Sequence, residues 1–188
     1  MARPLSEDKR NAILDSAMHL IAEKGPGAST ADIAKRAGLP TGSLFTYFDT
    51  KAELYNALYR NLKSEVAAAV LADMPENDDV EKKLYHLWSA WTRWGALNTV
   101  ARKALAQLTI SDLVTTESRE AGMKAAASTV EIVRQASVRG LMGKAPSHYV
   151  GALVESMANT TMDFMLADPT RAEDISHSGF LALRQMLT

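Results

Sequence analysis

The sequence contains no cysteine among its 188 residues. Disulfide bonds and thiolate metal sites are therefore excluded, and a reducing compartment suits the chain. The first residues lack the apolar run of a signal peptide, and no stretch approaches the roughly 20 apolar residues of a membrane span. We therefore expect a soluble, cytoplasmic protein with no membrane partner.

An excess of positive charge is also missing. The chain has 21 Lys and Arg against 22 Asp and Glu, a formal net charge of -1. Its first 51 residues hold seven basic and six acidic side chains. Any affinity for nucleic acid must therefore come from where the charges lie, from helix N-termini and from dimerisation.

Sequence patterns of catalysis are absent as well. The chain has no glycine-rich phosphate loop and no nucleophile elbow, and its histidines are dispersed at His19, His86, His148 and His177. We therefore expect no enzyme activity, no catalytic residue, no metal site and no cofactor.

What the sequence does have is helical periodicity, in a composition that is 47% apolar and can bury a core. Apolar residues recur at three- and four-residue spacing, and none alternate with period two over a useful length. We expect an all-α fold of about nine helices, with a three-helix domain over 1–50 and a second helical domain over 51–188. The expected helix starts are an N-cap at Ser6, a capping box at Thr50 and Glu53, a second capping box at Asp78 and Glu81, a cap at Asn98 and an N-cap with proline at Asp168-Pro169. The helix that begins at Thr50 should end near Ala72. We also expect one long helix within Ser111–Leu141 and another over Ser147–Leu166.

The segment Thr30–Lys51 has the layout of a helix-turn-helix, whose second helix enters the DNA major groove. Thr30 is expected to cap the first helix, and Gly38 to take the left-handed conformation that ends it. Leu44 and Phe48, spaced i and i+4, should face the core. The outward face then consists of Thr41, Gly42, Ser43, Phe45, Thr46 and Tyr47. The alternative is a compact helical corner without a DNA function.

Residues Ser29–Leu54 resemble the DNA-binding segment of the tetracycline-repressor (TetR) family of bacterial regulators. The matching residues are Thr30, Ile33-Ala34, Ala37-Gly38, Gly42-Ser43-Leu44-Phe45, Tyr47-Phe48, Lys51 and Leu54. Further stretches resemble the RamR-type multidrug-sensing regulators of that family: Ala2-Arg3-Pro4, Ser6-Glu7-Asp8-Lys9, Trp94-Gly95, Thr160-Thr161-Met162-Asp163-Phe164 and Asp168-Pro169.

The resemblance implies a homodimer, formed through the last two helices, on a near-palindromic double-stranded DNA operator. It implies that Thr30 contacts phosphate, that Lys51 touches the DNA backbone, and that the recognition surface comprises Pro40, Thr41, Gly42, Ser43, Phe45, Thr46 and Tyr47. Phe45 departs from the tyrosine common at its position in the family.

The resemblance also implies a small-molecule effector. Aromatic side chains concentrate between Tyr55 and Trp94, and Trp94 should turn away from Trp88 and Trp91 because each three-residue step drifts by about 60° around a helix. The expected effector-binding residues are Tyr59, Leu84, Trp88, Trp91, Ala136, Gly151, Val154 and Glu155. Aromatic walls suit lipophilic or cationic molecules, although an aromatic cluster at helical spacing is also typical of an ordinary core. Glu155 could face the pocket, the dimer interface or solvent.

The last two expected helices carry more apolar side chains than one protomer obviously needs: Val150, Leu153, Met157, Phe164, Met165, Phe180, Leu183 and Met186. They could form the dimer interface or serve the core of one chain. The function expected is a transcriptional repressor released from DNA by lipophilic or cationic molecules and controlling efflux genes. The alternatives are a regulator with a metabolite effector and a helical small-molecule-binding protein without a DNA function.

Overall fold

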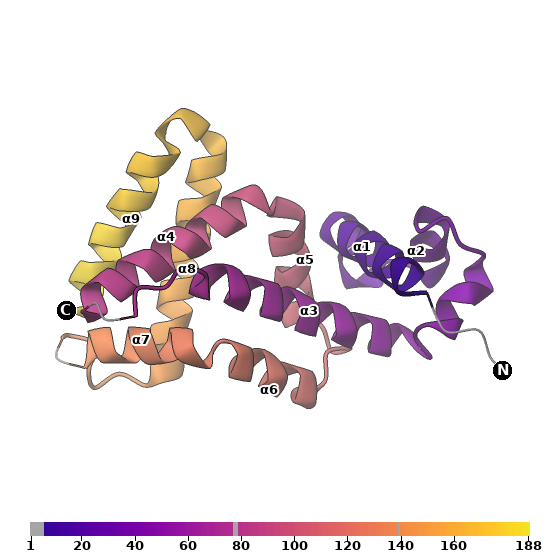
Figure 1. Cartoon of the computed structure of the whole chain (residues 1–188), viewed down its shortest axis with the longest axis horizontal. Coiled ribbons are helices and arrows are strands. Elements are labelled where there is room, and N and C mark those ends of the chain that lie inside the picture. Colours follow the sequence, from indigo (N-terminus) through magenta and orange to yellow (C-terminus); the bar gives the residue numbers. More distant parts are fainter. Residues whose placement is uncertain (1–5, 77–78, 139) are drawn as a thin grey trace. The chain divides into compact units, whose positions relative to one another are not determined.

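The computed structural model describes residues 6–76, 79–138 and 140–188. They form nine α-helices and three short 3-10 helices and contain no strand, so the predicted all-α fold is confirmed (Figure 1). The α-helices are α1 Glu7–Lys24, α2 Thr30–Arg36, α3 Lys51–Leu71, α4 Val80–Leu97, α5 Thr99–Thr109, α6 Thr116–Ala125, α7 Ala127–Ser137, α8 Ser147–Ala167 and α9 Ala172–Leu187. The 3-10 helices are η1 Gly25–Gly27, η2 Thr41–Thr46 and η3 Pro169–Arg171. No helix of the described residues is long and apolar enough to cross a membrane.

The predicted N-cap bonds of α2 and α3 are each displaced by a single residue. Ser29, not Thr30, caps α2: its backbone is extended, and its hydroxyl accepts a hydrogen bond from the Asp32 amide at 3.0 Å. Thr50 accepts from the Glu53 amide at 3.0 Å as expected, but the Glu53 carboxylate accepts from the Asp49 amide at 2.7 Å rather than from that of Thr50. In each case a neighbouring residue supplies the same kind of bond.

The helix α4 is capped by Asp79, whose carboxylate accepts from the Lys82 amide at 2.9 Å. Two predicted features lie outside the described residues: the cap at Asp78 and the N-terminal stretch Ala2-Arg3-Pro4.

The single long helix predicted within Ser111–Leu141 is wrong. Residues 111–115 form turns, α6 begins at Thr116, and a break at Ala126 separates α6 from α7. Ala126 has a ψ of 2°, away from helical values, and the alanines around it give the sequence no glycine or proline to mark the break.

The chain packs into two compact units. The first comprises residues 1–63 and 99–124, and the second comprises residues 64–98 and 125–188. In the first unit α1 packs on α2 and α5, so the predicted three-helix domain shares its core with α5. In the second unit α8 and α9 form a hairpin that packs on α4 (Figure 1). These packing units divide the chain differently from the boundary at residue 50, which stays a prediction about function.

Candidate nucleic-acid interface and effector-binding residues

The turn between α2 and η2 has the geometry that the sequence predicts. Gly38 has a φ of 69°, a left-handed conformation that a β-carbon disfavours. The Leu39 amide donates to the Ala34 carbonyl at 2.9 Å, and the Gly38 amide donates to the Lys35 carbonyl at 3.2 Å. This pair of bonds is a Schellman motif, which satisfies the last carbonyls of α2 and sets the direction in which the chain enters η2.

The helix η2 is held from one side and open on the other. Leu44 and Phe48 are buried, as predicted, and anchor it to the core of the first unit. The candidate DNA-binding residues lie on the remaining surface: Pro40, Thr41, Gly42, Phe45 and Thr46 are exposed, while Ser43, Tyr47, Thr30 and Lys51 are half-buried. The helix is a 3-10 helix, narrower than an α-helix, and its exposed side chains are the hydroxyls of Thr41 and Thr46 and the phenyl ring of Phe45. The phenol of Tyr47 follows the helix and is half-buried.

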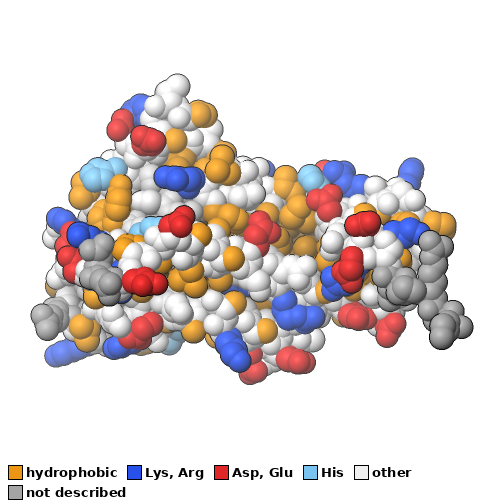
Figure 2. All heavy atoms as spheres, in the orientation of Figure 1, with side chains coloured by type: hydrophobic (Ala, Val, Ile, Leu, Met, Phe, Trp, Pro, Cys, Tyr) orange, Lys and Arg blue, Asp and Glu red, His pale blue; other side chains and the backbone are white. Residues whose placement is uncertain are grey.

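Two basic side chains near this surface, Lys24 and Arg36, are engaged with acids. The Lys24 ammonium lies 3.2 Å from the Asp32 carboxylate, and the Arg36 guanidinium lies 3.8 Å from that of Glu23. The hydrogen bond from Lys24 holds the pKa of Asp32 below its ordinary value, with a smaller contribution from Ser29. Acidic and basic side chains are likewise interspersed on the face seen in Figure 2. Hydroxyls, backbone amides and Lys51, rather than a basic patch, are therefore the polar groups of this candidate surface.

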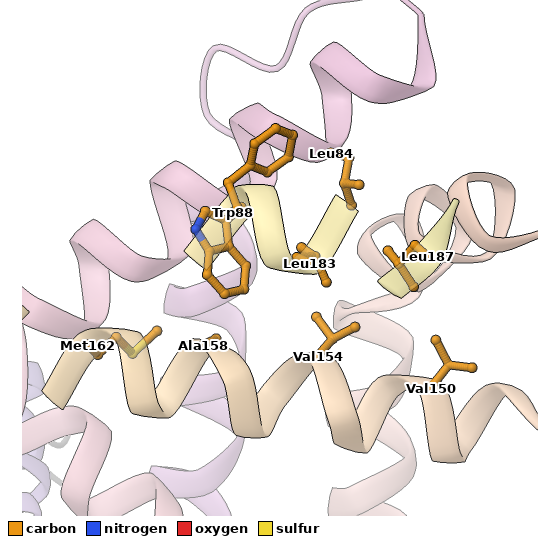
Figure 3. Packing of buried hydrophobic residues seen from close by; sticks show 9 residues of the cluster. Leu84, Trp88, Val150, Val154, Ala158, Met162, Leu183 and Leu187 are labelled. Carbon is orange, nitrogen blue, oxygen red and sulfur yellow. The ribbon is translucent and has the colours of Figure 1, made fainter. Parts of the chain in front are cut away.

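Five of the expected effector-binding residues come together in the second unit. Leu84, Trp88 and Val154 belong to its central apolar cluster, and Trp91 and Ala136 pack against that cluster. Figure 3 shows side chains from α4, α8 and α9 pointing toward one another across this core. The arrangement brings distant segments of the chain together as a packed interior.

Trp88 is the centre of this packing, with none of its surface exposed. Its indole N–H donates to the Ser176 carbonyl of α9 at 2.8 Å. A β-carbon at Gly179 would come within 2.7 Å of the indole ring, so the glycine is what permits the close approach of α9. Trp94 points elsewhere, as the helical drift predicts, and its indole N–H donates to Glu65 at 3.3 Å.

The other three expected residues lie outside this cluster. Tyr59 is buried in the first unit, where its ring lies close to Gly122 of α6. Gly151 and Glu155 are exposed on α8, so Glu155 does not point into the core. Their part in effector binding stays a prediction.

Two open grooves lie on the second unit. One, of about 640 Å³, is lined by Leu84 and Ala136 together with residues that the sequence does not single out, among them Val80 and Arg184. Arg184 of α9 reaches Glu81 of α4 at 2.8 Å across it. The other, of about 1110 Å³, runs between α4 and α9 along Tyr85, His177 and Phe180, with the Tyr85 and Phe180 rings edge to face at 4.9 Å. Both grooves form where helices that are far apart in the sequence pack together, and hydrophobic periodicity does not show which helices these are.

Comparison with known proteins gives a family for the N-terminal part. Residues 13–58 match the family of bacterial regulatory proteins of the tetR type. The HTH-type transcriptional repressor Rv3405c of Mycobacterium tuberculosis (strain ATCC 25618 / H37Rv) is 35% identical over 79 residues, which are 42% of this chain and 42% of that protein. The match therefore spans less than half of the relative's length.

Solved structures extend the likeness to nearly the whole chain. A tetR-family transcription regulator from Shewanella sp. PV-4 has a TM-score of 0.81 at 26% identity, over 93% of this chain and 95% of its own. LfrR from Mycobacterium smegmatis, in complex with proflavine, has a TM-score of 0.69 at 18% identity over 97% and 98% of the two chains. FadR from Bacillus subtilis, in complex with stearoyl-CoA, has a TM-score of 0.69 at 17% identity over 95% and 99%. The last two show the fold alone, and the tetR-type match itself covers residues 13–58.

Proposed function

We propose that this chain, as a TetR-family transcriptional regulator, is a ligand-responsive repressor that binds a near-palindromic operator as a homodimer. The observation that carries the proposal is the outward face of η2, which the buried Leu44 and Phe48 hold in place and which lies within the tetR-type match. In a dimer two such helices would enter successive major grooves about 34 Å apart.

The proposed DNA contacts follow from exposure and chemistry. Thr41, Ser43 and Thr46 offer hydroxyls that either donate to or accept from base edges, and Phe45, 45% exposed, offers an apolar face to a thymine methyl. Tyr47, Thr30 and Lys51 would bind phosphates and set the register. Pro40 and Gly42 add no polar side chain and let the backbone approach the DNA closely.

A gel-shift titration with the DNA upstream of the protein's own gene tests this proposal, with a scrambled duplex as the control. We expect a shift that favours the upstream DNA and weakens steeply with added salt. No preference for any upstream fragment would instead favour a helical small-molecule-binding protein without a DNA function.

We further propose that the effector is a lipophilic or cationic molecule that binds the second unit beside Leu84, Trp88, Trp91, Ala136 and Val154. Support comes from the aromatic side chains there, from the RamR-type stretches at Trp94-Gly95 and Thr160–Phe164, and from the proflavine bound to LfrR. Control of efflux genes would follow from that chemistry. The stearoyl-CoA bound to FadR favours the alternative, an acyl metabolite.

Quenching of tryptophan fluorescence separates these effectors. The panel would hold proflavine, a bile acid and stearoyl-CoA, each titrated into wild type and into the Trp91→Phe variant, whose altered residue is half-buried beside the cluster. Saturable quenching by proflavine or the bile acid supports the multidrug proposal, and quenching by stearoyl-CoA alone supports the metabolite. No quenching by any lipophilic ligand would contradict both.

We propose that the dimer forms through exposed side chains of α8 and α9. The expected apolar set divides here: Val150, Met165, Phe180 and Leu183 are buried within one chain, Leu153, Met157 and Met186 are half-buried, and Phe164 is 63% exposed. Leu166 of α8 and Leu181 of α9 are also exposed. A ligand that prefers the conformer with wrongly spaced recognition helices would then shift the population off DNA.

Light scattering after size exclusion tests the dimer. Phe164→Glu should turn a dimer into a monomer because it places a charge in the apolar contact. Leu97→Glu is the matched control, since Leu97 is 77% exposed but lies on α4. An unchanged mass for Phe164→Glu would contradict this interface.

A further inference from the structure

Tyr55 of α3 is a fully buried residue that lies next to the candidate DNA surface without belonging to it. None of its surface is exposed, and its hydroxyl donates to the Pro26 carbonyl at 3.0 Å, with the Ala28 carbonyl 3.5 Å away. Both carbonyls belong to the connection between α1 and α2. The phenol therefore ties the start of α3 to the helices that carry the turn.

One helical turn before it, Lys51 lies over the same ring. The Lys51 ammonium is 5.2 Å from the centroid of the Tyr55 ring, within the range of a cation–π interaction. Among the residues that the structure describes, no carboxylate oxygen lies within 4.0 Å of this ammonium. The nearby Glu53 carboxylate instead accepts from the Asp49 amide. Lys51 is thus held by an aromatic face and not by an acidic side chain.

We propose that Tyr55 is a positioning residue for DNA binding: its ring holds the Lys51 ammonium where a DNA phosphate is bound. This inference rests on the proposed DNA function and deepens it. A cation–π contact uses one side of the ammonium and leaves its other N–H groups free to donate to phosphate oxygens. Because the long lysine stem is already ordered, less side-chain freedom is lost when the DNA arrives.

The burial of Tyr55 keeps the aromatic ring that contacts Lys51 in one protonation state and one orientation. Burial raises the pKa of the phenol to about 12 from 10.0, so the group remains a neutral donor to the Pro26 carbonyl. With the hydroxyl fixed at one end and the ring enclosed, the aromatic face that Lys51 occupies cannot turn away. The same residue therefore connects the position of the cation to the position of η1 and α2.

A double-mutant cycle tests the inference on the full chain, with DNA from upstream of its own gene and a scrambled duplex as probes. The variants are Tyr55→Leu, Lys51→Ala and the two together. Lys51→Ala should lower the salt slope of binding by about one per protomer. Tyr55→Leu should weaken binding about two- to fivefold to both duplexes while Lys51 is present, and should add nothing in the Lys51→Ala background.

Tyr55→Phe is the conservative variant. It keeps the ring and should restore the affinity and salt slope lost in Tyr55→Leu, although it lacks the hydroxyl bonds and is less stable. The inference would be overturned if Tyr55→Leu lowered DNA affinity equally in the presence and in the absence of Lys51. It would also be overturned if Tyr55→Phe and Tyr55→Leu lowered DNA affinity equally. No binding by the wild type, or no effect of Lys51→Ala, would instead overturn the proposed DNA function or the proposed phosphate contact.

If Tyr55→Leu does not fold, nuclear magnetic resonance of the free protein tests whether the Lys51 side chain lies over the Tyr55 ring. The Lys51 ε-methylene protons should be shifted upfield by the ring current in wild type and in Tyr55→Phe. Leu58→Ala, which alters a buried residue on the next turn of α3, is the control for general destabilisation and should keep that shift. Unshifted Lys51 protons in the wild type would overturn the inference.

Discussion

The two units present their candidate binding residues in opposite ways. Around η2 the side chains expected to bind are exposed or half-buried, while two others, Leu44 and Phe48, hold the segment in place. In the second unit the expected residues Leu84, Trp88 and Val154 are themselves the core. The first surface is ready to bind a rigid partner. For the proposed effector to bind there, the second unit has to open or take the ligand in an adjacent groove, which would couple binding to packing.

The largest effect that sharpens this comparison is expected at Trp88. Trp88→Ala removes a fully buried indole and its bond to the Ser176 carbonyl and should cost about 3–5 kcal/mol of unfolding free energy. Denaturant unfolding measures it, and Trp91→Ala, at a half-buried residue, should cost clearly less. A loss below about 1 kcal/mol combined with lost effector binding would make Trp88 a wall of the site and not a support of the core.

The second prediction compares two glycines of the candidate DNA-binding segment. A β-carbon at either Gly38 or Gly42 would meet no atom within 4 Å, but only Gly38 has a positive φ. Gly38→Ala should therefore destabilise the protein by about 1–2 kcal/mol, and Gly42→Ala by less than about 0.5 kcal/mol.

Unfolding and gel-shift titrations of the two glycine variants give the readouts. Gly42→Ala should lower DNA affinity despite its stability, because the added methyl group lies on the face proposed to meet DNA. Full affinity in Gly42→Ala would move the DNA surface away from this part of η2.

This contrast also shows what the sequence could reveal. The turn at Gly38 and the inward direction of Leu44 and Phe48 follow from short-range backbone rules, so they are predictable. The N-cap of α2 is Ser29 and not Thr30. Both residues carry a hydroxyl, and the spacing of the sequence does not show which of the two caps the helix. The break at Ala126 has no marker. Trp88 meets Ser176 across 88 residues and Glu81 meets Arg184 across 103, so neither the core nor the groove beside it can be derived from periodicity.

The third prediction concerns two polar residues of the same face. Tyr47→Ala should weaken binding to every sequence by about two- to tenfold because it removes a phosphate donor. Thr41→Ala should instead change which base is preferred at one operator position while leaving binding to scrambled DNA nearly unchanged. Salt titrations on operator and scrambled duplexes separate the two. Intact affinity in Tyr47→Ala would show that this phenol does not contact the backbone.

The last prediction is an alkaline effect at the buried Tyr55. Its pKa is raised to about 12 in the folded chain from 10.0. Between these two values the unfolded chain releases this proton while the native chain holds it, so the native state binds more protons and its stability falls as pH rises. Below pH 10 the contribution is fully present. Tyr55→Phe should remove this part of the pH dependence, so the stability difference between wild type and variant should narrow from pH 10 to pH 12. Denaturant unfolding of both proteins between pH 9 and pH 12 measures this difference, and a difference that stayed constant with pH would mean that burial does not raise the pKa of this phenol.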